Sequence, residues 1–258
     1  MQEILNYLDM SLVNKNIPRI VWMYWNQGVD RAPSLIRKCI ESWRHYNPTW
    51  EVRVLDDVNL SEYVDLESLC GPNKNTTIQA KSDIIRLKVL NDFGGVWADS
   101  TIWCHVPLDD WLSDVIMISD FFAFAAPKSD RRLSSWFLVS SPGGYMINEW
   151  YKSMVSYWNE HSVAHVYPWV HYLFNDLHKL DPKFTDMWSR VPKFSAKVHR
   201  GKHGPHFFAN YGQVCSGPLT DDIKEKIDAR DIPMYKLTRK GRSLVGLPKI
   251  DYLLDSLI

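Results

Sequence analysis

Strand-like and helix-like segments alternate over the first hundred residues, and this alternation constrains the fold more than any other feature. Residues 17–25 are rich in β-branched and aromatic side chains and predict a buried strand, and helically spaced apolar residues follow at 33–46. Residues 50–55 predict a second strand, residues 76–93 the clearest helix, and residues 96–98 a short third strand. This order favours an α/β fold with a mixed, largely parallel sheet.

The pattern is weaker in the later part of the chain. Residues 121–126 and 136–140 predict further strands, and residues 144–159 and 165–179 predict helices. Beyond Pro182, many Gly, Pro and His residues favour loops.

Charge and cysteine usage argue against several classes of protein. Thirty Lys and Arg residues balance thirty Asp and Glu residues, whereas a dedicated nucleic-acid binder usually has a basic excess. The four cysteines lack CxxC spacing, so we expect reduced, mostly buried thiols in a cytoplasmic protein rather than a disulfide framework or a zinc site.

Neither end of the chain has a clear targeting or membrane-spanning pattern. Residues 4–13 predict a short helix broken by polar residues, and no run reaches the roughly 18 apolar residues that a membrane span needs. The apolar residues from Leu244 to Ile258 suit a docked core helix or tail at least as well as peripheral membrane attachment.

Polar residues follow each of the first three predicted strands. Residues 24–28 end the first strand, Asp56 and Asp57 the second, and residues 99–101 the third. Ligands of parallel sheets bind at the carboxyl ends of the strands, so these groups are expected on one rim.

Asp99 is the rim residue best suited to a metal ion. A carboxylate held rigidly after two glycines and a short strand could bind a hard divalent cation, with a diphosphate completing the shell. Such an ion would stabilise the charge that grows on a leaving group. The alternative is an Asp that caps a turn.

Asp83 and Arg86 lie three residues apart on the helix that precedes Asp99. They could form a local ion pair, worth about 0.2–1 kcal/mol on a solvated face. The functional alternative is that Asp83 accepts hydrogen bonds from sugar hydroxyls while Arg86 orients Asp99 or a phosphate.

The runs Ala80–Arg86 and Leu90–Thr101 resemble the capsular-polysaccharide-synthesis glycosyltransferases. These are relatives of glycosyltransferase family 32, in which SD-x-x-R and GG-x-[YW]-x-D recur. The resemblance covers about residues 17–240, and its weaker landmarks occur in the expected order: Ile17–Trp22, Trp136-Phe137 with Ser140, His171–Phe174, Asp181-Pro182 and Lys236–Thr238.

The resemblance implies one GT-A-like domain spanning residues 1–258, with residues 17–126 binding a nucleotide sugar and residues 127–258 binding the acceptor. It implies a hexosyltransferase that uses a nucleoside-diphosphate sugar, in the first instance a UDP-sugar, with Mn²⁺ or Mg²⁺ and retention of the anomeric configuration. The acceptor would be a hydroxyl of a glycan or lipid-linked glycan, such as capsule or lipopolysaccharide. The reaction would take place in the cytoplasm or at the cytoplasmic face of a membrane.

The same resemblance assigns roles to the central block. Asp99 becomes the first Asp of the DxD motif, and Asp83 and Arg86 become contacts of the donor sugar. Thr101 stands at the second acidic position of the motif and offers a hydroxyl without a charge. Ser100, between them, is a further candidate donor contact.

Aromatic and acidic residues at the strand ends are candidate nucleotide contacts. Trp22, Tyr24 and Trp25 either stack on the base or fill the core. Asp57, like its neighbour Asp56, either accepts hydrogen bonds from the base or ribose or serves the turn.

Candidates from the C-terminal half are Lys236 and Lys240 for phosphate and His206 for the metal ion or diphosphate. His206 is otherwise an ordinary loop histidine. The acceptor would lie against Trp136 and residues near 169–172.

Two rival functions remain open on sequence alone. One is a non-catalytic glycan-binding module on a transferase scaffold, which Thr101 mildly favours. The other is a sugar-phosphate transferase, which would release a nucleoside monophosphate rather than a diphosphate.

Overall fold

A mixed β-sheet forms the centre of the fold in the computed structural model, which describes residues 17–71, 76–117, 119–199, 202–208, 217–237 and 245–256. Within this part of the chain the sheet has five strands in the order β2-β1-β3-β6-β5. Their bounds are Ile20–Tyr24 (β1), Glu51–Leu55 (β2), Gly95–Ala98 (β3), Phe121–Lys128 (β5) and Arg131–Ser140 (β6). The predicted helix 4–13, Cys215 and Lys240 lie outside the described residues.

The strand directions confirm the expected α/β class. β1 pairs in parallel with both β2 and β3, whereas β6 pairs in antiparallel fashion with β3 and β5. Four of these five described strands therefore run in one direction and β6 opposes them. The carboxyl ends of β1, β2 and β3 meet at one edge of the sheet.

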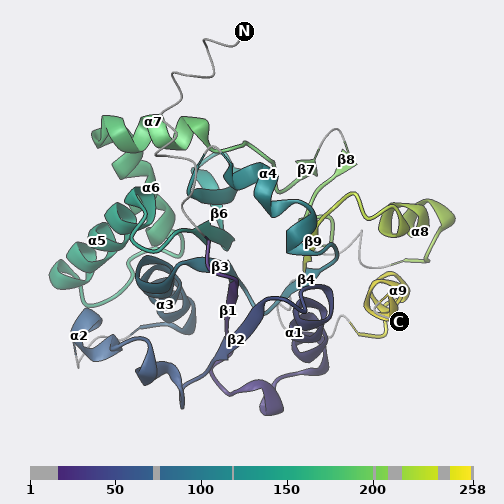
Figure 1. The fold of residues 1–258 in the computed structure, drawn as a ribbon. Coiled ribbons are helices and arrows are strands. Elements are labelled where there is room, and N and C mark those ends of the chain that lie inside the picture. The colour runs from purple at the N-terminus through teal and green to yellow at the C-terminus, as the bar shows by residue number, and fades with distance from the viewer. Residues whose placement is uncertain are drawn as a thin grey trace, which may run out of the picture.

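Helices cover both faces of the sheet (Figure 1). On one side lie α2 (Leu66–Cys70), α3 (Ile78–Phe93), α5 (Tyr145–Glu160) and α6 (Trp169–Leu180), with α7 (Pro182–Arg190) beyond α6. On the other side lie α1 (Ser34–Tyr46), the strand pair β4 (Ile102–Cys104) and β9 (Met234–Lys236), α8 (Asp221–Asp228) and α9 (Pro248–Asp255). The short elements α4 (Leu112–Ile116), β7 (Val198–His199) and β8 (Lys202–His203) complete the order, with 3₁₀ turns at Val29–Arg31, Leu60–Glu62 and Leu108–Asp110.

The expectation of loops beyond Pro182 is wrong for several segments. α7 begins at Pro182, whose missing N–H suits the first turn of a helix, and Asp181 accepts hydrogen bonds from the main-chain N–H groups of Lys183 and Phe184. α8 and β9 follow further along. These elements are short, so their periodicity is hard to separate from loop sequence.

Two glycines make the turn that joins α3 to β3. Gly94 and Gly95 have φ angles of +64° and +94°. A Cβ on Gly94 would lie 2.6 Å from Pro142, and one on Gly95 would lie 2.6 Å from the carbonyl oxygen of Ile20. Only glycine combines this backbone conformation with such close approach. The turn thereby fixes where β3 ends and where Asp99 lies.

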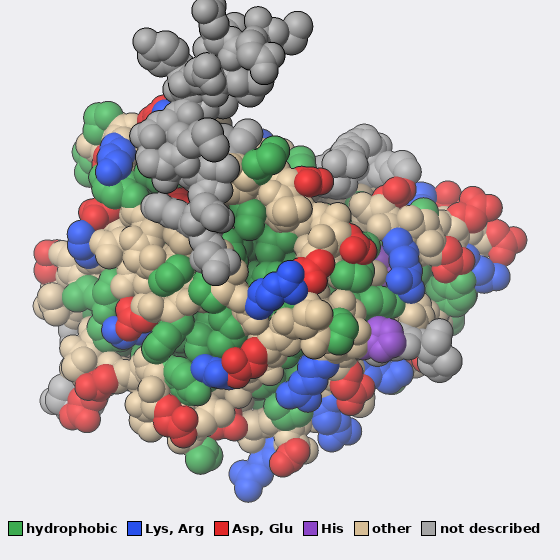
Figure 2. All heavy atoms as spheres, in the orientation of Figure 1, with side chains coloured by type: hydrophobic (Ala, Val, Ile, Leu, Met, Phe, Trp, Pro, Cys, Tyr) green, Lys and Arg blue, Asp and Glu red, His purple; other side chains and the backbone are tan. Residues whose placement is uncertain are grey.

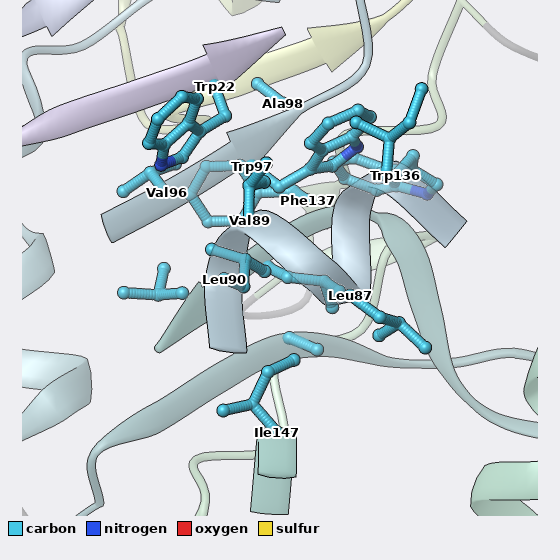
Figure 3. Close-up of a cluster of buried hydrophobic side chains, with 14 of the residues drawn as sticks. Trp22, Leu87, Val89, Leu90, Val96, Trp97, Ala98, Trp136, Phe137 and Ile147 are labelled. Carbon is cyan, nitrogen blue, oxygen red and sulfur yellow. The ribbon is translucent and has the colours of Figure 1, made fainter. Parts of the chain in front are cut away.

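The larger apolar cluster packs the sheet against α3, α5 and α6. Figure 3 shows Trp97 and Phe137 from adjacent strands, and Leu87 of α3, within this cluster. A smaller cluster joins α1, β4, β9 and α9 and includes Leu35, Trp103, Tyr235, Leu237, Ile250, Leu253 and Leu254. The C-terminal segment is therefore a docked helix in its described part.

The remaining features agree with the simple expectations. Cys39, Cys70 and Cys104 are all buried. Among the described residues, no helix is both long and apolar enough to cross a membrane. Lys, Arg, Asp and Glu side chains intermingle over the face seen in Figure 2.

Candidate functional site

A cavity of about 670 Å³ opens at the carboxyl ends of the central strands. Its walls come from the end of β1, the first turns of α3, the end of β3, the middle of β6 and β9. Asp83, Arg86, Asp99 and Lys236 all line it, although Lys236 is 137 residues from Asp99 in the sequence. The structure therefore brings these four predicted residues together, while their chemical roles stay predictions.

Asp99 faces the cavity with both carboxylate oxygens engaged. Its main-chain N–H donates to the carbonyl of Trp136 (2.9 Å), which continues the β3–β6 pairing and fixes the position of the residue. Oδ1 accepts hydrogen bonds from Arg86 Nη2 (2.9 Å) and Trp97 Nε1 (3.0 Å), and Oδ2 accepts one from Lys236 Nζ (2.7 Å). Desolvation would raise the pKa of Asp99, but Lys236 and Arg86 outweigh it and hold the pKa at about 2. Asp99 is an anion at any physiological pH.

Arg86 joins the two carboxylates of the site. Its guanidinium donates to Asp83 Oδ1 as well as to Asp99, and it lies over the ring of Trp97, 5.1 Å from the centroid. The side chain is only 4% exposed, so the guanidinium is a fixed part of the cavity floor. Burial raises the pKa of Asp83 to about 6, against the opposing effect of Arg86.

Lys236 reaches the site because β9 pairs with β4, which begins just after Thr101. The pairing places Ile102 opposite Lys236. The ammonium donates to Thr101 Oγ1 (2.7 Å) in addition to Asp99. Arg86 and Lys236 together balance the charges of Asp83 and Asp99, so an incoming diphosphate needs further positive charge.

The oxygens of Asp99 and Thr101 fit a cation that arrives with a phosphate ligand. Both oxygens accept a hydrogen bond from the Lys236 ammonium, so they converge on the position that this ammonium occupies. Mg²⁺ commonly takes one or two protein oxygens besides waters and substrate phosphates. Among the described residues, no three His, Cys, Asp or Glu side chains form a metal-binding group. His206 lines the same cavity, and both its role as a metal ligand and the ion itself stay predictions.

Ser100 and Tyr24 stabilise the carboxyl-terminal edge of the sheet. Ser100 is buried and donates its hydroxyl to the carbonyl of Tyr24 (2.5 Å), which ties the ends of β3 and β1 together. The Tyr24 hydroxyl donates to Asp57 (2.7 Å), and Lys81 pairs with the same carboxylate oxygen (2.6 Å). Tyr24 and Ser100 line the cavity, whereas Asp57 is outside the set of described residues that line it. Asp57 therefore orients the Tyr24 side chain from outside the cavity.

The aromatic residues of the first strand divide between the cavity and the core. Trp25 lines the cavity, as expected for a base-stacking candidate. The prediction that Trp22 contacts the nucleotide is wrong, because its ring is fully buried and its Nε1 donates to the carbonyl of Gly94 at the far end of α3 (2.9 Å). Figure 3 shows Trp22 and Trp136 at opposite ends of the cluster. Trp22 precedes the strand end by two residues, which is enough to keep it in the core.

Asp56 serves the turn rather than the cavity. Its carboxylate accepts hydrogen bonds from the main-chain N–H groups of Val58 (2.8 Å) and Asn59 (3.0 Å). The turn alternative is therefore the correct one for this residue.

Residues of the C-terminal half form the opposite wall. Trp136 lines the cavity with its ring 5.4 Å from that of His206, while Tyr167 and His171 stand beside it. Trp169, by contrast, is only 3% exposed and belongs to the core. Burial, followed by nearby positive charge, lowers the pKa of His206 to about 4 and that of His171 to about 3, so both imidazoles are neutral at pH 7.

Several residues of the cavity escaped the sequence reasoning. Trp97 precedes Asp99 by two residues on a strand, so strand alternation could have placed it on the same face. Arg131 follows a hairpin turn, and Tyr167 and Lys197 come from connections whose path no local pattern predicts.

The fold and the cavity define a class: an α/β protein with a pocket at its strand ends that is lined by Asp83, Arg86, Asp99 and Lys236. A model of the family described as capsular polysaccharide synthesis protein matches residues 2–243, so the chain belongs to that family. The link to glycosyltransferase family 32 stays a prediction.

Curated relatives of this chain carry glycosyltransferase names. Over 176 residues it is 30% identical to "Glycosyltransferase afumC" of Aspergillus fumigatus, covering 61% of this chain and 45% of the relative. Over 271 residues it is 25% identical to "O-glycosyltransferase braB" of Annulohypoxylon truncatum, covering 87% of this chain and 64% of the relative. The chain thus spans about half to two thirds of the length of these proteins.

Solved glycosyltransferase structures give weaker similarities. The PaToxG glycosyltransferase has a TM-score of 0.48 at 12% identity, covering 99% of this chain and 94% of its own. A glycosyltransferase involved in glycosylation of the major capsid of PBCV-1 has a TM-score of 0.46 at 12% identity, covering 93% and 98%.

Proposed function

We propose that this chain is a glycosyltransferase that moves a sugar from a nucleoside diphosphate, in the first instance a UDP-sugar, to a hydroxyl of a glycan or lipid-linked glycan. The observation that carries the proposal is the cavity at the strand ends, which Asp99 faces between Arg86 and Lys236. Family membership and the names of the curated relatives support the same activity.

The donor would lie across the strand ends. The base stacks on Trp25 or Tyr24, and the sugar hydroxyls donate to Asp83, whose side chain is 12% exposed. The diphosphate lies against Lys236, with Lys197 supplying a further positive charge on the cavity wall. A divalent cation held by Asp99 and Thr101 would offset the remaining charge of the diphosphate.

The reaction proposed is substitution with retention of configuration. The acceptor hydroxyl oxygen forms the new bond to the anomeric carbon on the face from which the diphosphate departs. The bond between that carbon and the phosphate oxygen breaks, and a phosphate oxygen takes the hydroxyl proton. The protein contributes position and charge stabilisation. The low pKa values of His171 and His206 support this scheme, because both imidazoles are weak bases.

A donor-hydrolysis screen tests the proposal. Purified protein is incubated with a panel of nucleoside-diphosphate sugars, with and without Mn²⁺, and release of the nucleoside diphosphate is measured. We expect one donor to be hydrolysed slowly without acceptor. Asp99→Asn should lower that rate at least about a hundredfold, because a neutral amide is a weaker ligand for the cation that offsets the charge of the diphosphate. Asp109→Asn, which alters an exposed ion pair with Arg19, is the matched control.

The outcome separates the rival functions. A glycan-binding module would hydrolyse no donor, and a sugar-phosphate transferase would release a nucleoside monophosphate. Near-normal hydrolysis by folded Asp99→Asn protein would falsify the role given to Asp99. Thermal melting of each variant is recorded alongside, because Asp99 also compensates two cations.

The expected setting of the enzyme follows from its substrates. We place the reaction in the cytoplasm, at or near the membrane that carries a lipid-linked acceptor. Fractionation of cells that express tagged protein tests this placement.

A further inference from the structure

A second cavity, of about 450 Å³, adjoins the first one. Arg131, at the start of β6, lines both cavities, so the two are neighbours across a single side chain. The second cavity is otherwise bounded by the β5–β6 turn, α6, α7 and the segment after α7. We call it the basic cavity, because its lining includes Arg131, Arg132, Lys179 and Lys193.

Two of these cations lack a counter-charge. Arg131 pairs with Asp130 through two hydrogen bonds of 3.1 Å, and Lys179 pairs with Asp176 at 3.0 Å. Within the described part of the chain, no carboxylate lies at ion-pair distance from Arg132 or Lys193. An anionic ligand would therefore meet positive charge that the protein does not neutralise.

Lys193 is held in place by hydrogen bonds, although the residue is exposed. Its ammonium donates to the main-chain carbonyl oxygens of Trp188 and Val191 (2.5 Å for the latter) and lies 4.1 Å from the centroid of the Trp188 ring. Partial desolvation lowers the pKa of this ammonium to about 8. Two of its three N–H donors are used, so one remains for a ligand.

The positive charges of Arg132 and Lys193 both affect His178, so the two cations lie near the same side chain. Desolvation lowers the pKa of His178 on α6, and both cations lower it further. His178 therefore stays neutral near pH 7. The positive charge of the basic cavity comes from the arginines and lysines.

We infer that the basic cavity binds a carboxylate or phosphate group carried by the acceptor glycan, so that the natural acceptor is an acidic glycan. The inference rests on the proposed function and deepens it. The donor diphosphate is assigned to the first cavity, beside Lys236, and a glycan longer than one sugar can extend from there past Arg131. Its anionic group then meets Arg132 and Lys193, which specify charge without taking part in the sugar transfer.

Paired probes, one with an acidic group and one without it, test the inference. Trigalacturonate is compared with its methyl ester, and maltotriose phosphate with maltotriose, by isothermal titration calorimetry at pH 7. We expect at least one acidic probe to bind about tenfold tighter than its neutral partner, a fair value for two charge-assisted contacts. Preference for the carboxylated or for the phosphorylated probe identifies the source of the anion.

Substitutions then test whether the preference for the acidic probe depends on Arg132 and Lys193. Arg132→Gln/Lys193→Met should remove the preference for the acidic probe. Lys152→Met, which alters an exposed lysine paired with Glu149 on α5, should keep it. The inference is overturned if neither acidic probe is preferred, or if the double variant retains the preference.

Donor hydrolysis without acceptor keeps this test separate from the proposed function. Neither Arg132 nor Lys193 lines the donor cavity, so we expect the double variant to hydrolyse the donor at the wild-type rate. If the protein hydrolyses a donor but does not prefer the acidic probe, the inference of an acidic acceptor is rejected and the proposed transferase function stands. If the acidic probe is preferred but neither wild-type nor variant protein hydrolyses a donor, the proposed transferase function is rejected.

Discussion

At the residue scale, one buried guanidinium holds two carboxylates that differ in acidity. Asp99 is paired with Lys236 as well as Arg86, whereas Asp83 shares Arg86 and is more deeply buried. Their pKa values consequently separate to about 2 and about 6. A difference of this kind assigns constant charge to Asp99 and a titratable charge to Asp83.

The pH dependence of donor hydrolysis should report Asp83. Its pKa in the folded protein lies above the ordinary value of 3.8, so the carboxylate gains a proton as the pH falls through about 6 and then accepts sugar hydroxyls less well. We expect kcat/KM to fall on the acid side of pH 6. Asp83→Asn should be less active and should lack this limb. A profile of wild-type and variant protein between pH 5 and 8 checks the prediction, and an identical acid limb in both would contradict it.

Replacement of Lys236 should change two affinities in opposite directions. Lys236→Met removes the ammonium that occupies the oxygens of Asp99 and Thr101, so Mn²⁺ should bind the nucleotide-free protein several-fold more tightly. The same change removes a phosphate contact, so UDP should bind about tenfold more weakly in the absence of metal. Calorimetric titrations with Mn²⁺ alone and UDP alone test both directions. Weaker Mn²⁺ binding would contradict the proposed competition.

At the element scale, the α3–β3 turn decides where the site residues lie. α3 carries Asp83 and Arg86, β3 delivers Asp99, and Gly94 and Gly95 set the angle between the two elements. The sequence predicted both elements, as a helix over residues 76–93 and a short strand over residues 96–98.

Two glycine substitutions separate backbone strain from steric overlap in this region. Gly143→Ala places a Cβ at φ +63° with no neighbouring heavy atom within 4 Å, and should cost about 1 kcal/mol. Gly95→Ala adds overlap with Ile20 and should cost about 3 kcal/mol. Urea unfolding of the two variants measures the difference. If both variants lose the same free energy of unfolding, the α3–β3 turn relaxes around the new Cβ of Gly95→Ala. Donor hydrolysis by Gly95→Ala protein would then be unchanged.

The elements that the sequence predicted well lie in the first hundred residues, where strand-like and helix-like segments alternate. β1, α1, β2, α3 and β3 all lie where residues 17–98 indicated. Elements after Pro182 were missed because α7, α8 and β9 are short and take their stability from tertiary packing. Strand pairing was also beyond local patterns, since β9 joins β4 across more than half of the chain.

The same reasoning explains which site residues were found. Asp83, Arg86 and Asp99 belong to one continuous motif, and Lys236 stood out only as a late candidate. Trp22 was misassigned because a strand pattern does not tell how far a ring lies from the sheet edge. Arg131 and Tyr167 depend on connections that periodicity does not describe.

At the scale of the whole molecule, the smaller apolar cluster couples the C-terminal helix to the site. Leu253 of α9 packs in the same buried group as Tyr235 and Leu237, which precede and follow Lys236 in the sequence. Packing far from the cavity therefore holds a residue that touches Asp99.

Loss of this packing should lower both stability and donor affinity. Leu253→Ala leaves a cavity at a fully buried position and should cost about 2–5 kcal/mol. It should also raise the donor KM at temperatures well below the melting point, because β9 loosens around Lys236. Leu180→Ala, at a position 82% exposed, is the control and should change neither quantity. An unchanged KM in destabilised Leu253→Ala protein would argue against the coupling.

The distance along the chain between Asp99 and Lys236 also bears on synthesis. A ribosome releases the sheet, α3 and Arg86 well before it reaches β9. A growing or prematurely stopped polypeptide therefore has the acidic half of the pocket without the ammonium that balances it. Fragments that end upstream of β9 should be inert towards sugar nucleotides, so the proposed transfer requires a polypeptide completed at least as far as β9.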